Sequence, residues 1–318
     1  MSYISQREAI LKTKIIAQTK KDDFEEFWIE NVKKLRSKPL EISKVKIDTP
    51  YDKTITTYEI IFNTIDETKV YAYFSHPKNM TKKLPCVAVF GGGGSARSIY
   101  PQFVSTGICC FSMDNRSQGG LTFDKADYSM GDGYHGNPGA LLSCDLLNKD
   151  NYYLRNLYLD AIRAIDVIST LEEVDAGKIV TYGMSQGGAL SIVSAALSGK
   201  VMRTFPVVPS YSCLPQRVEA GSGVFSAVKS YLTRFPSHVD EVLDTLSYFD
   251  MNNMVSLLTV PASFNLGMID PICIPEFVYS VYSHVAGEKE IQFAPFTGHV
   301  ISHDFMQYML NEFAKLSD

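Results

Sequence analysis

From residue 84 onward, short runs of apolar residues alternate with longer segments of helical periodicity. Six runs are almost continuously apolar: LPCVAVF, GICCFSMD, KIVTYG, MRTFPVVP, VPASFNLGM and EIQFAPF. Strands of this kind are buried on both faces, which is typical of a parallel sheet covered by helices. The clearest intervening helix is expected over residues 152–171, where apolar side chains recur on one stripe. The pattern therefore predicts an α/β fold with a mostly parallel, doubly wound sheet.

The residues around this sheet follow other patterns. Residues 5–36 are charged with recurring apolar positions, so we expect one or two helices within an N-terminal helical extension, 1–40. The segments SKVKIDTP and TITTYEIIFNTIDETKVYAYFSHP are rich in Val, Ile, Thr and Tyr and predict antiparallel strands. Residues 211–249 combine Pro and Gly with amphipathic pieces and predict a helical insertion that caps the site. All of this is expected within a single domain, 1–318.

Composition narrows the class of protein. A chain of 318 residues with 45% hydrophobic content can bury one large core. The net charge of −5 gives no general attraction to nucleic acid or to anionic lipid. The six cysteines lack C-x-x-C spacing, and no apolar run approaches the roughly 18 residues that span a bilayer. We therefore expect a cytoplasmic protein with free thiols and with neither nucleic-acid nor membrane partners.

One short motif carries chemistry. The run KIVTYG leads into Gly183-Met184-Ser185-Gln186-Gly187, which is followed by the small-residue segment GALSIVSAAL. This is G-x-S-x-G in the order strand, sharp turn and helix, the context in which the motif presents a nucleophilic serine. The alternative is a tight turn with an unreactive serine. The flanking pattern favours Ser185 as a nucleophile.

A serine nucleophile needs a base, and the base needs an acid that fixes its tautomer. In doubly wound hydrolases the acid and then the histidine follow the serine along the chain. Asp270 ends the run VPASFNLGMID and His299 follows EIQFAPF, so both are expected at the carboxyl ends of neighbouring strands, where open α/β sheets bind ligands. His284, in the middle of a predicted helix, His303 and the possible helix cap Asp250 are weaker candidates.

Several separate segments resemble the acetyl xylan esterase and cephalosporin C deacetylase family of serine hydrolases. They are NRSQGG (115–120), KDNYYLRNLYLDAIRAIDVI (149–168), GMSQGGAL (183–190), TLSYFDMNNM (245–254) and GMIDPICIP (267–275). The resemblance implies an α/β-hydrolase fold in which Ser185 is the nucleophile, Asp270 the acid and His299 the base. It also implies a cytoplasmic deacetylase of small acetylated sugars that forms a homo-oligomer, with a hexamer favoured.

Two short segments differ from the family's usual pattern. The chain has Gly91-Gly92-Gly93 where the family usually has His-Gly-Tyr, and Val300 where glutamate usually follows the histidine. The first difference removes an aromatic wall of the acyl pocket but leaves the backbone donor. The second removes an acid beside the histidine.

The glycine-rich stretch VFGGGGSAR (89–97) allows two interpretations. Gly91, Gly93 and Ala96 fit the dinucleotide-binding spacing G-x-G-x-x-G/A, with Asp114 further on as a possible ribose-binding acid. However, SARSIYPQF does not look like the start of a helix, and Pro101 is expected to interrupt one. We therefore favour the second interpretation, in which the backbone N–H groups of Gly93 and Gln186 form an oxyanion hole.

The resulting prediction is a serine esterase that removes short acyl groups, foremost acetyl, from hydroxyls of small carbohydrate-like substrates through an acyl-enzyme. A broad short-chain carboxylesterase or a peptidase on the same fold stays open, because a triad does not define the acyl donor. A non-catalytic, hydrolase-like binding protein also stays open. No metal or cofactor is expected, because no cluster of His, Cys or acidic residues has ligand spacing along the sequence.

Overall fold

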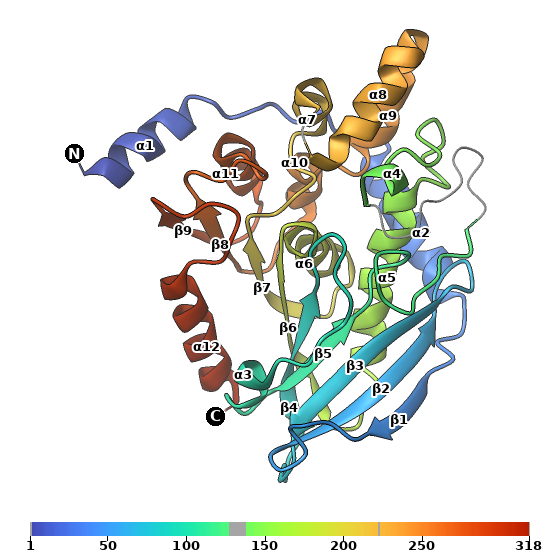
Figure 1. The fold of residues 1–318 in the computed structure, drawn as a ribbon, viewed down its shortest axis with the longest axis vertical. Coiled ribbons are helices and arrows are strands. Elements are labelled where there is room, and N and C mark those ends of the chain that lie inside the picture. The colour runs from blue at the N-terminus through green and yellow to red at the C-terminus, as the bar shows by residue number, and fades with distance from the viewer. Residues whose placement is uncertain (1, 127–137, 222, 318) are drawn as a thin grey trace.

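A twisted mixed sheet forms the centre of the protein (Figure 1). The computed structural model describes residues 2–126, 138–221 and 223–317, and within these the strand order is β1-β2-β3-β5-β4-β6-β7-β8-β9. The strands are β1 (Ser43–Ile47), β2 (Ile55–Asn63), β3 (Lys69–Pro77), β4 (Leu84–Phe90), β5 (Cys109–Met113), β6 (Val174–Met184), β7 (Val201–Val207), β8 (Ala262–Gly267) and β9 (Lys289–Ala294). Strands β1 to β3 pair antiparallel, β3 pairs antiparallel with β5, and all pairs from β5 to β9 are parallel, as the apolar pattern predicts.

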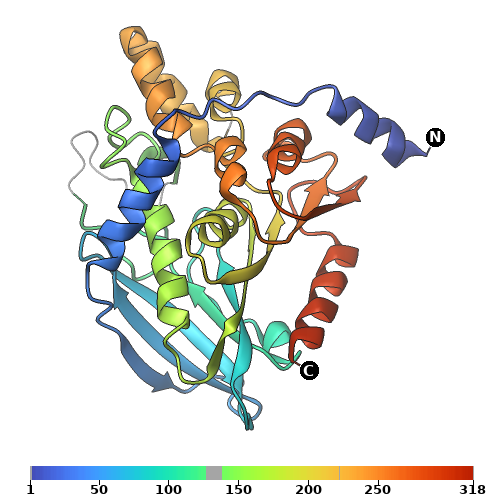
Figure 2. The same ribbon diagram turned by 180° about the vertical axis from the view of Figure 1, so that it is seen from behind.

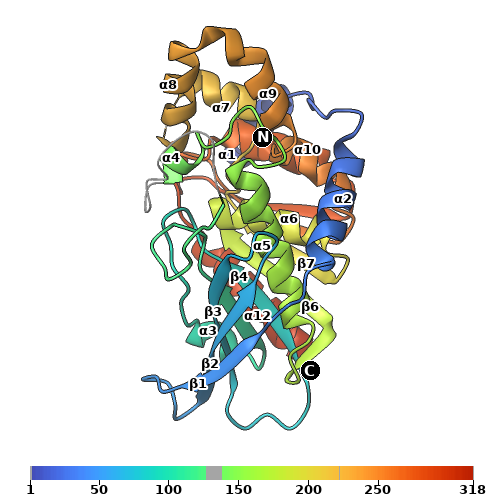
Figure 3. The same cartoon turned by 90° about the vertical axis from the view of Figure 1, so that its right-hand side faces the viewer.

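Helices cover both faces of the sheet (Figures 2 and 3). One face carries α2 (Phe24–Arg36), α5 (Tyr153–Ile168) and α6 (Gln186–Leu197), and the other carries α3 (Pro101–Val104) and α12 (His303–Ser317). In β4, alternate side chains enter the two cores: Cys86, Ala88 and Phe90 join the first, and Val87 and Val89 the second. Burial on both faces explains why this strand is apolar throughout.

The N-terminal segment forms two helices, as its periodicity predicts. They are α1 (Tyr3–Lys12), which extends away from the body in Figure 1, and α2, which packs on α5. The Trp28 ring of α2 is fully buried, stacks on Tyr158 of α5 and donates its indole N–H to the Tyr248 carbonyl at 3.0 Å. The α2 helix also has glutamates in its first turn and basic residues in its last, which suits its macrodipole.

Residues 214–247 hold three helices in the segment for which the sequence predicts an insertion. These are α7 (Leu214–Ala220), α8 (Ser226–Arg234) and α9 (Val239–Ser247), and residue 222 lies outside the described residues. They form the upper end of the molecule in Figures 1 and 3. Tyr211 donates a hydrogen bond of 2.5 Å to the Gln186 side chain, and Arg217 donates one to the Ile272 carbonyl. The insertion therefore touches the segments that follow β6 and β8.

Two details differ from the sequence-based picture. Pro101 begins α3 rather than interrupting a helix, because the first helical position does not need its N–H. His284 is the last residue of α11 (Pro275–His284), not a mid-helix residue. The remaining α-helices, both short, are α4 (Pro138–Leu141) and α10 (Met251–Met254). All six cysteines are free and buried, as expected. Among the described residues, no helix combines the length and the apolarity needed to cross a membrane.

Candidate active site

Ser185 sits on a strained turn between β6 and α6. Its backbone angles are φ 59° and ψ −120°, a region that residues with a side chain rarely adopt. Such a conformation costs on the order of 1–3 kcal/mol and persists only where the surroundings impose it. Here the Ser185 N–H donates to the Val207 carbonyl at 3.0 Å, and the Ser185 carbonyl accepts from the Ser210 N–H at 2.9 Å. The turn is thus held by the chain that leaves β7.

Two glycines make this turn possible. A Cβ on Gly183 would overlap the backbone of Gly187, and a Cβ on Gly187 would overlap the carbonyl of Phe90 at the end of β4. These are backbone atoms of the packed helix α6 and strand β4, which cannot move aside as a flexible side chain can. The G-x-S-x-G spacing is therefore a steric requirement of the turn.

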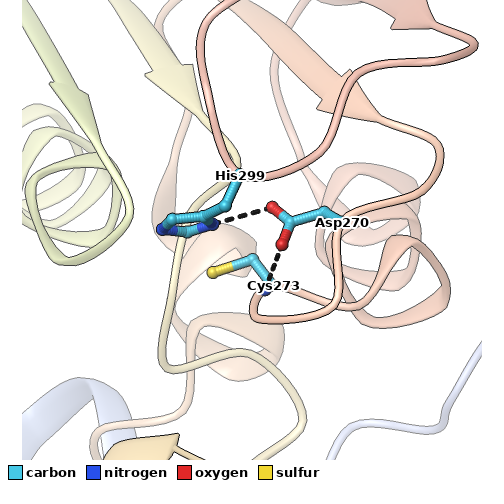
Figure 4. Close-up of side chains that lie close together, drawn as sticks. All are labelled: Asp270, Cys273 and His299. Carbon is cyan, nitrogen blue, oxygen red and sulfur yellow. Dashed lines mark hydrogen bonds and ion pairs between the residues drawn. The ribbon is translucent and has the colours of Figure 1, made fainter.

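Asp270 and His299 meet at the carboxyl ends of β8 and β9 (Figure 4). The distance between His299 Nδ1 and Asp270 Oδ2 is 2.8 Å. An ionised carboxylate can only accept hydrogen bonds, so Nδ1 donates and the neutral ring has Nε2 free to accept a proton. Asp270 is buried, and its other oxygen accepts from the backbone N–H groups of Ile272 and Cys273 at 2.8 and 2.9 Å. This arrangement is that of a base held in one tautomer by an acid.

The same contacts set the charge of the imidazole. The hydrogen bond to Asp270 is the largest cause that raises the pKa of His299 above its ordinary 6.5; contact with Cys273 adds to the rise and burial opposes it. The imidazole side chain keeps 18% of its surface exposed. These contacts therefore favour proton uptake by His299, and its imidazole remains partly exposed.

The described contacts contain no hydrogen bond between Ser185 Oγ and His299. The structure thus brings Asp270 and His299 into contact and places Ser185 after β6, a parallel strand of the same sheet that β7 separates from β8. In free enzymes the bond between nucleophile and base is often long and tightens only when substrate binds.

The structure also brings together three potential metal ligands that sequence spacing does not reveal. One ligand atom each from Asp270, Cys273 and His299 lies within 4.8 Å of the other two. In Figure 4 the Cys273 sulfur lies beside the His299 ring. Thiolate, imidazole and carboxylate are ligands that suit zinc. Asp270 and His299 already bond to each other, which is the arrangement that supports acid–base chemistry.

The glycine-rich loop adjoins the Ser185 turn. A Cβ on Gly92 would lie 3.6 Å from the Met184 carbonyl, and Gly91 lies beside Gly187. Gln186 is buried and is the first residue of α6, so its N–H has no carbonyl partner within the helix. Both sequence-predicted donor residues, Gly93 and Gln186, therefore belong to segments next to Ser185.

The remaining candidates have other partners. The Asp114 carboxylate is fully buried and accepts hydrogen bonds from the Arg97 guanidinium at 2.8 Å and from the Leu121 N–H at 2.7 Å. It is therefore not available to bind a ribose hydroxyl. Asp250 caps α10 and accepts hydrogen bonds from three backbone N–H groups. His284 contacts the Ile16 carbonyl, and His303 begins α12. These contacts leave Asp270 and His299 as the best-placed candidates for an acid–base pair and argue against the dinucleotide interpretation.

Two amide side chains at this site were not singled out from the sequence. Asn115 and Gln118 follow β5 and hydrogen-bond to the glycine-rich loop, at Gly91, Gly92 and Gly94. They lie within NRSQGG (115–120), a segment that resembles the family but whose sequence alone does not indicate what these two side chains do. Their contacts depend on how two distant loops meet, which the sequence pattern does not encode.

A mostly parallel sheet with a serine turn after one strand, and an acid and a histidine after two others, defines an α/β-hydrolase. The chain belongs to the acetyl xylan esterase family: the model of the family described as Acetyl xylan esterase (AXE1) matches residues 7–316. The family expected from the sequence is therefore confirmed.

Individual relatives agree with this assignment. The chain is 26% identical over 284 residues to the acetyl esterase Axe7A of Xylanibacter ruminicola, covering 87% of this chain and 63% of that protein. The chain thus spans less than two thirds of that relative's length. An acetyl xylan esterase from a Paenibacillus species is similar in structure, with a TM-score of 0.90 and 29% identity over 99% of this chain and 100% of the other. Acetyl xylan esterase 1 from a Thermoanaerobacterium species shares the fold, with a TM-score of 0.87 and 23% identity over 100% and 99% of the two chains.

Proposed function

We propose that this protein is a serine esterase that removes acetyl groups from the hydroxyls of small carbohydrate-like substrates. The observation that carries the proposal is the strained Ser185 turn together with the 2.8 Å contact between His299 Nδ1 and Asp270. Membership of the acetyl xylan esterase family supports the acetyl group and the carbohydrate.

The proposed reaction has two halves. Ser185 Oγ attacks the acetyl carbonyl carbon while His299 Nε2 takes its proton, and Asp270 stabilises the imidazolium that forms. The N–H groups of Gly93 and Gln186 hold the negative oxygen of the tetrahedral intermediate. Collapse transfers the proton from Nε2 to the leaving sugar hydroxyl and leaves an acetyl-serine. Water, activated by the same imidazole, then releases acetate and restores Ser185.

Location and assembly are further parts of the proposal. Six free, buried cysteines support a reducing, cytoplasmic setting. The resemblance to hexameric deacetylases supports a homo-oligomer. We also propose that the 211–249 insertion acts as a cap, supported by its contacts with Gln186 and Ile272. Light scattering that gives the mass of a single chain at micromolar concentration would refute the oligomer.

A panel of substrates tests the activity. We propose comparing kcat/KM for acetylated xylo-oligosaccharides, 4-nitrophenyl acetate, 4-nitrophenyl octanoate and a dipeptide amide, with Ser185→Ala as the matched control. The acetyl esters should react fastest, and Ser185→Ala should abolish hydrolysis without unfolding the chain. Faster cleavage of the octanoate or the amide would instead support a broad esterase or a peptidase. A folded protein that cleaves none of them would support a binding protein.

A further inference from the structure

The proposed oxyanion donor, the Gly93 N–H, lies in a loop of four glycines, which have no side chains that could fix the backbone. Gly91, Gly92, Gly93 and Gly94 follow β4 directly, and Gly94 adopts φ +80°. Glycine backbone is the most mobile in a chain, since it has no Cβ to restrict its dihedral angles. A donor that must be in place before the reaction therefore needs support from another segment.

Asn115 supports the peptide group between Gly92 and Gly93. Its side chain is fully buried, and Nδ2 donates to the Gly91 carbonyl at 3.2 Å and to the Gly92 carbonyl at 3.1 Å. The Gly92 carbonyl also accepts from the Ser95 N–H at 3.1 Å. The described chain contains no cis peptide bond, and in a planar trans peptide the C=O and N–H point in opposite directions. Fixing the Gly92 carbonyl therefore fixes the direction of the Gly93 N–H.

Gln118 supports the next peptide group. Its Oε1 accepts from the Gly94 N–H at 2.9 Å, which orients the plane between Gly93 and Gly94. The Gln118 and Gln186 side-chain amides bond to each other reciprocally, each at 3.0 Å, and Gln118 Nε2 also lies 2.7 Å from the Tyr153 hydroxyl. Gln118 is fully buried, so these bonds form away from competing water. One side chain thus links the glycine-rich loop to Gln186, the residue that offers the second proposed donor.

We infer that Asn115 and Gln118 are positioning residues for the oxyanion site: between them they hold both peptide planes that flank the Gly93 Cα. The inference rests on the proposed function, because it assigns no role in catalysis unless the Gly93 N–H binds the oxyanion. It goes beyond that function by naming the groups that make a loop of glycines rigid. Neutral amides suit this task because they orient backbone groups without adding a charge beside the developing oxyanion.

The test uses Asn115→Leu, which keeps the size of the side chain but removes the donor. A displacement of about 1 Å at a catalytic group can cost 10²-fold, so we expect kcat to fall roughly 10- to 100-fold. KM should change little, because the contact strengthens mainly in the transition state. The matched control is Asn31→Leu: Asn31 is equally buried and donates to the Phe27 carbonyl at 2.7 Å, but it lies on α2. It should lower the melting temperature without lowering kcat.

A double-mutant cycle separates positioning from general stability. Gly93→Pro removes the N–H that Asn115 is inferred to orient, so Asn115→Leu should lower kcat in the parent but not further in Gly93→Pro. An unchanged kcat in the folded variant, or an equal loss in both backgrounds, would overturn the inference. If Asn115→Leu does not fold, Gln118→Met is tested in the same cycle with the same expectations. If the parent hydrolyses acetyl esters through Ser185 but the effects of the two substitutions on kcat are additive, only this inference is refuted. An inactive parent would refute the proposed function.

Discussion

Replacing Asp270 with asparagine should disable the base while leaving the fold intact. Asp270 Oδ1 accepts two backbone N–H groups, from Ile272 and Cys273, so in Asp270→Asn the amide oxygen must occupy that position. The amide NH2 then faces His299 Nδ1, which lies 2.8 Å from the other carboxylate oxygen. A donor there forces Nδ1 to accept, which moves the imidazole proton to Nε2. The ring can then no longer take the proton from Ser185.

The size of the effect follows from this wrong tautomer. In a Ser-His-Asp triad, replacing the acid with its amide lowers kcat about 10⁴-fold, equivalent to ~5.4 kcal/mol of barrier. We would measure kcat with saturating 4-nitrophenyl acetate and the melting temperature of the same preparations. Activity within tenfold of the parent, in a folded variant, would refute the assignment of Asp270 as the orienting acid.

Three further changes probe the same site. Because Asp270 raises the pKa of His299, kcat/KM should rise with pH through a midpoint above 6.5, as the imidazolium loses its proton and becomes a base. The protonated ring also stabilises the fold. This stabilisation is full below pH 6.5 and is lost as the pH rises through the raised pKa of His299. A flat profile from pH 5 to 9 would argue against an imidazole base. Gly187→Ala should abolish activity and lower the melting temperature, because its Cβ would overlap the Phe90 carbonyl; an active variant with the parent's melting temperature would contradict the steric argument. Gly93→Pro should lower kcat about 10²- to 10³-fold, while Gly93→Ala, which keeps the N–H, should retain most activity; equal rates for Gly93→Pro and the parent would exclude the Gly93 donor.

The elements with simple burial patterns could be predicted from the sequence. The strands of the parallel sheet are apolar on both faces, so each stands out as a run such as LPCVAVF, which forms β4. The Ser185 turn could be predicted because its glycines are a local steric requirement. The family resemblance was also sound, since the family model covers residues 7–316.

The features of the site that could not be predicted from the sequence depend on contacts between distant segments. Asn115 reaches back 24 residues to Gly91, and Gln118 reaches 68 residues forward to Gln186, with no spacing rule that links either pair. Cys273 appeared only as one of six buried thiols, yet it lies beside the His299 ring. Pro101 was misjudged because proline both begins and ends helices, and only the position of α3 decides between the two.

Labelling with a fluorophosphonate tests the central claim most directly, because the reagent bonds covalently to a serine only where an activated hydroxyl is present. After incubation of the folded protein, we would map the modified residue by peptide mass spectrometry and follow acetyl ester hydrolysis in the same sample. We expect a single label on Ser185, with activity lost in proportion to labelling and no label on Ser185→Ala. An unlabelled Ser185 in folded protein that still hydrolyses acetyl esters would contradict the assignment of Ser185 as the nucleophile.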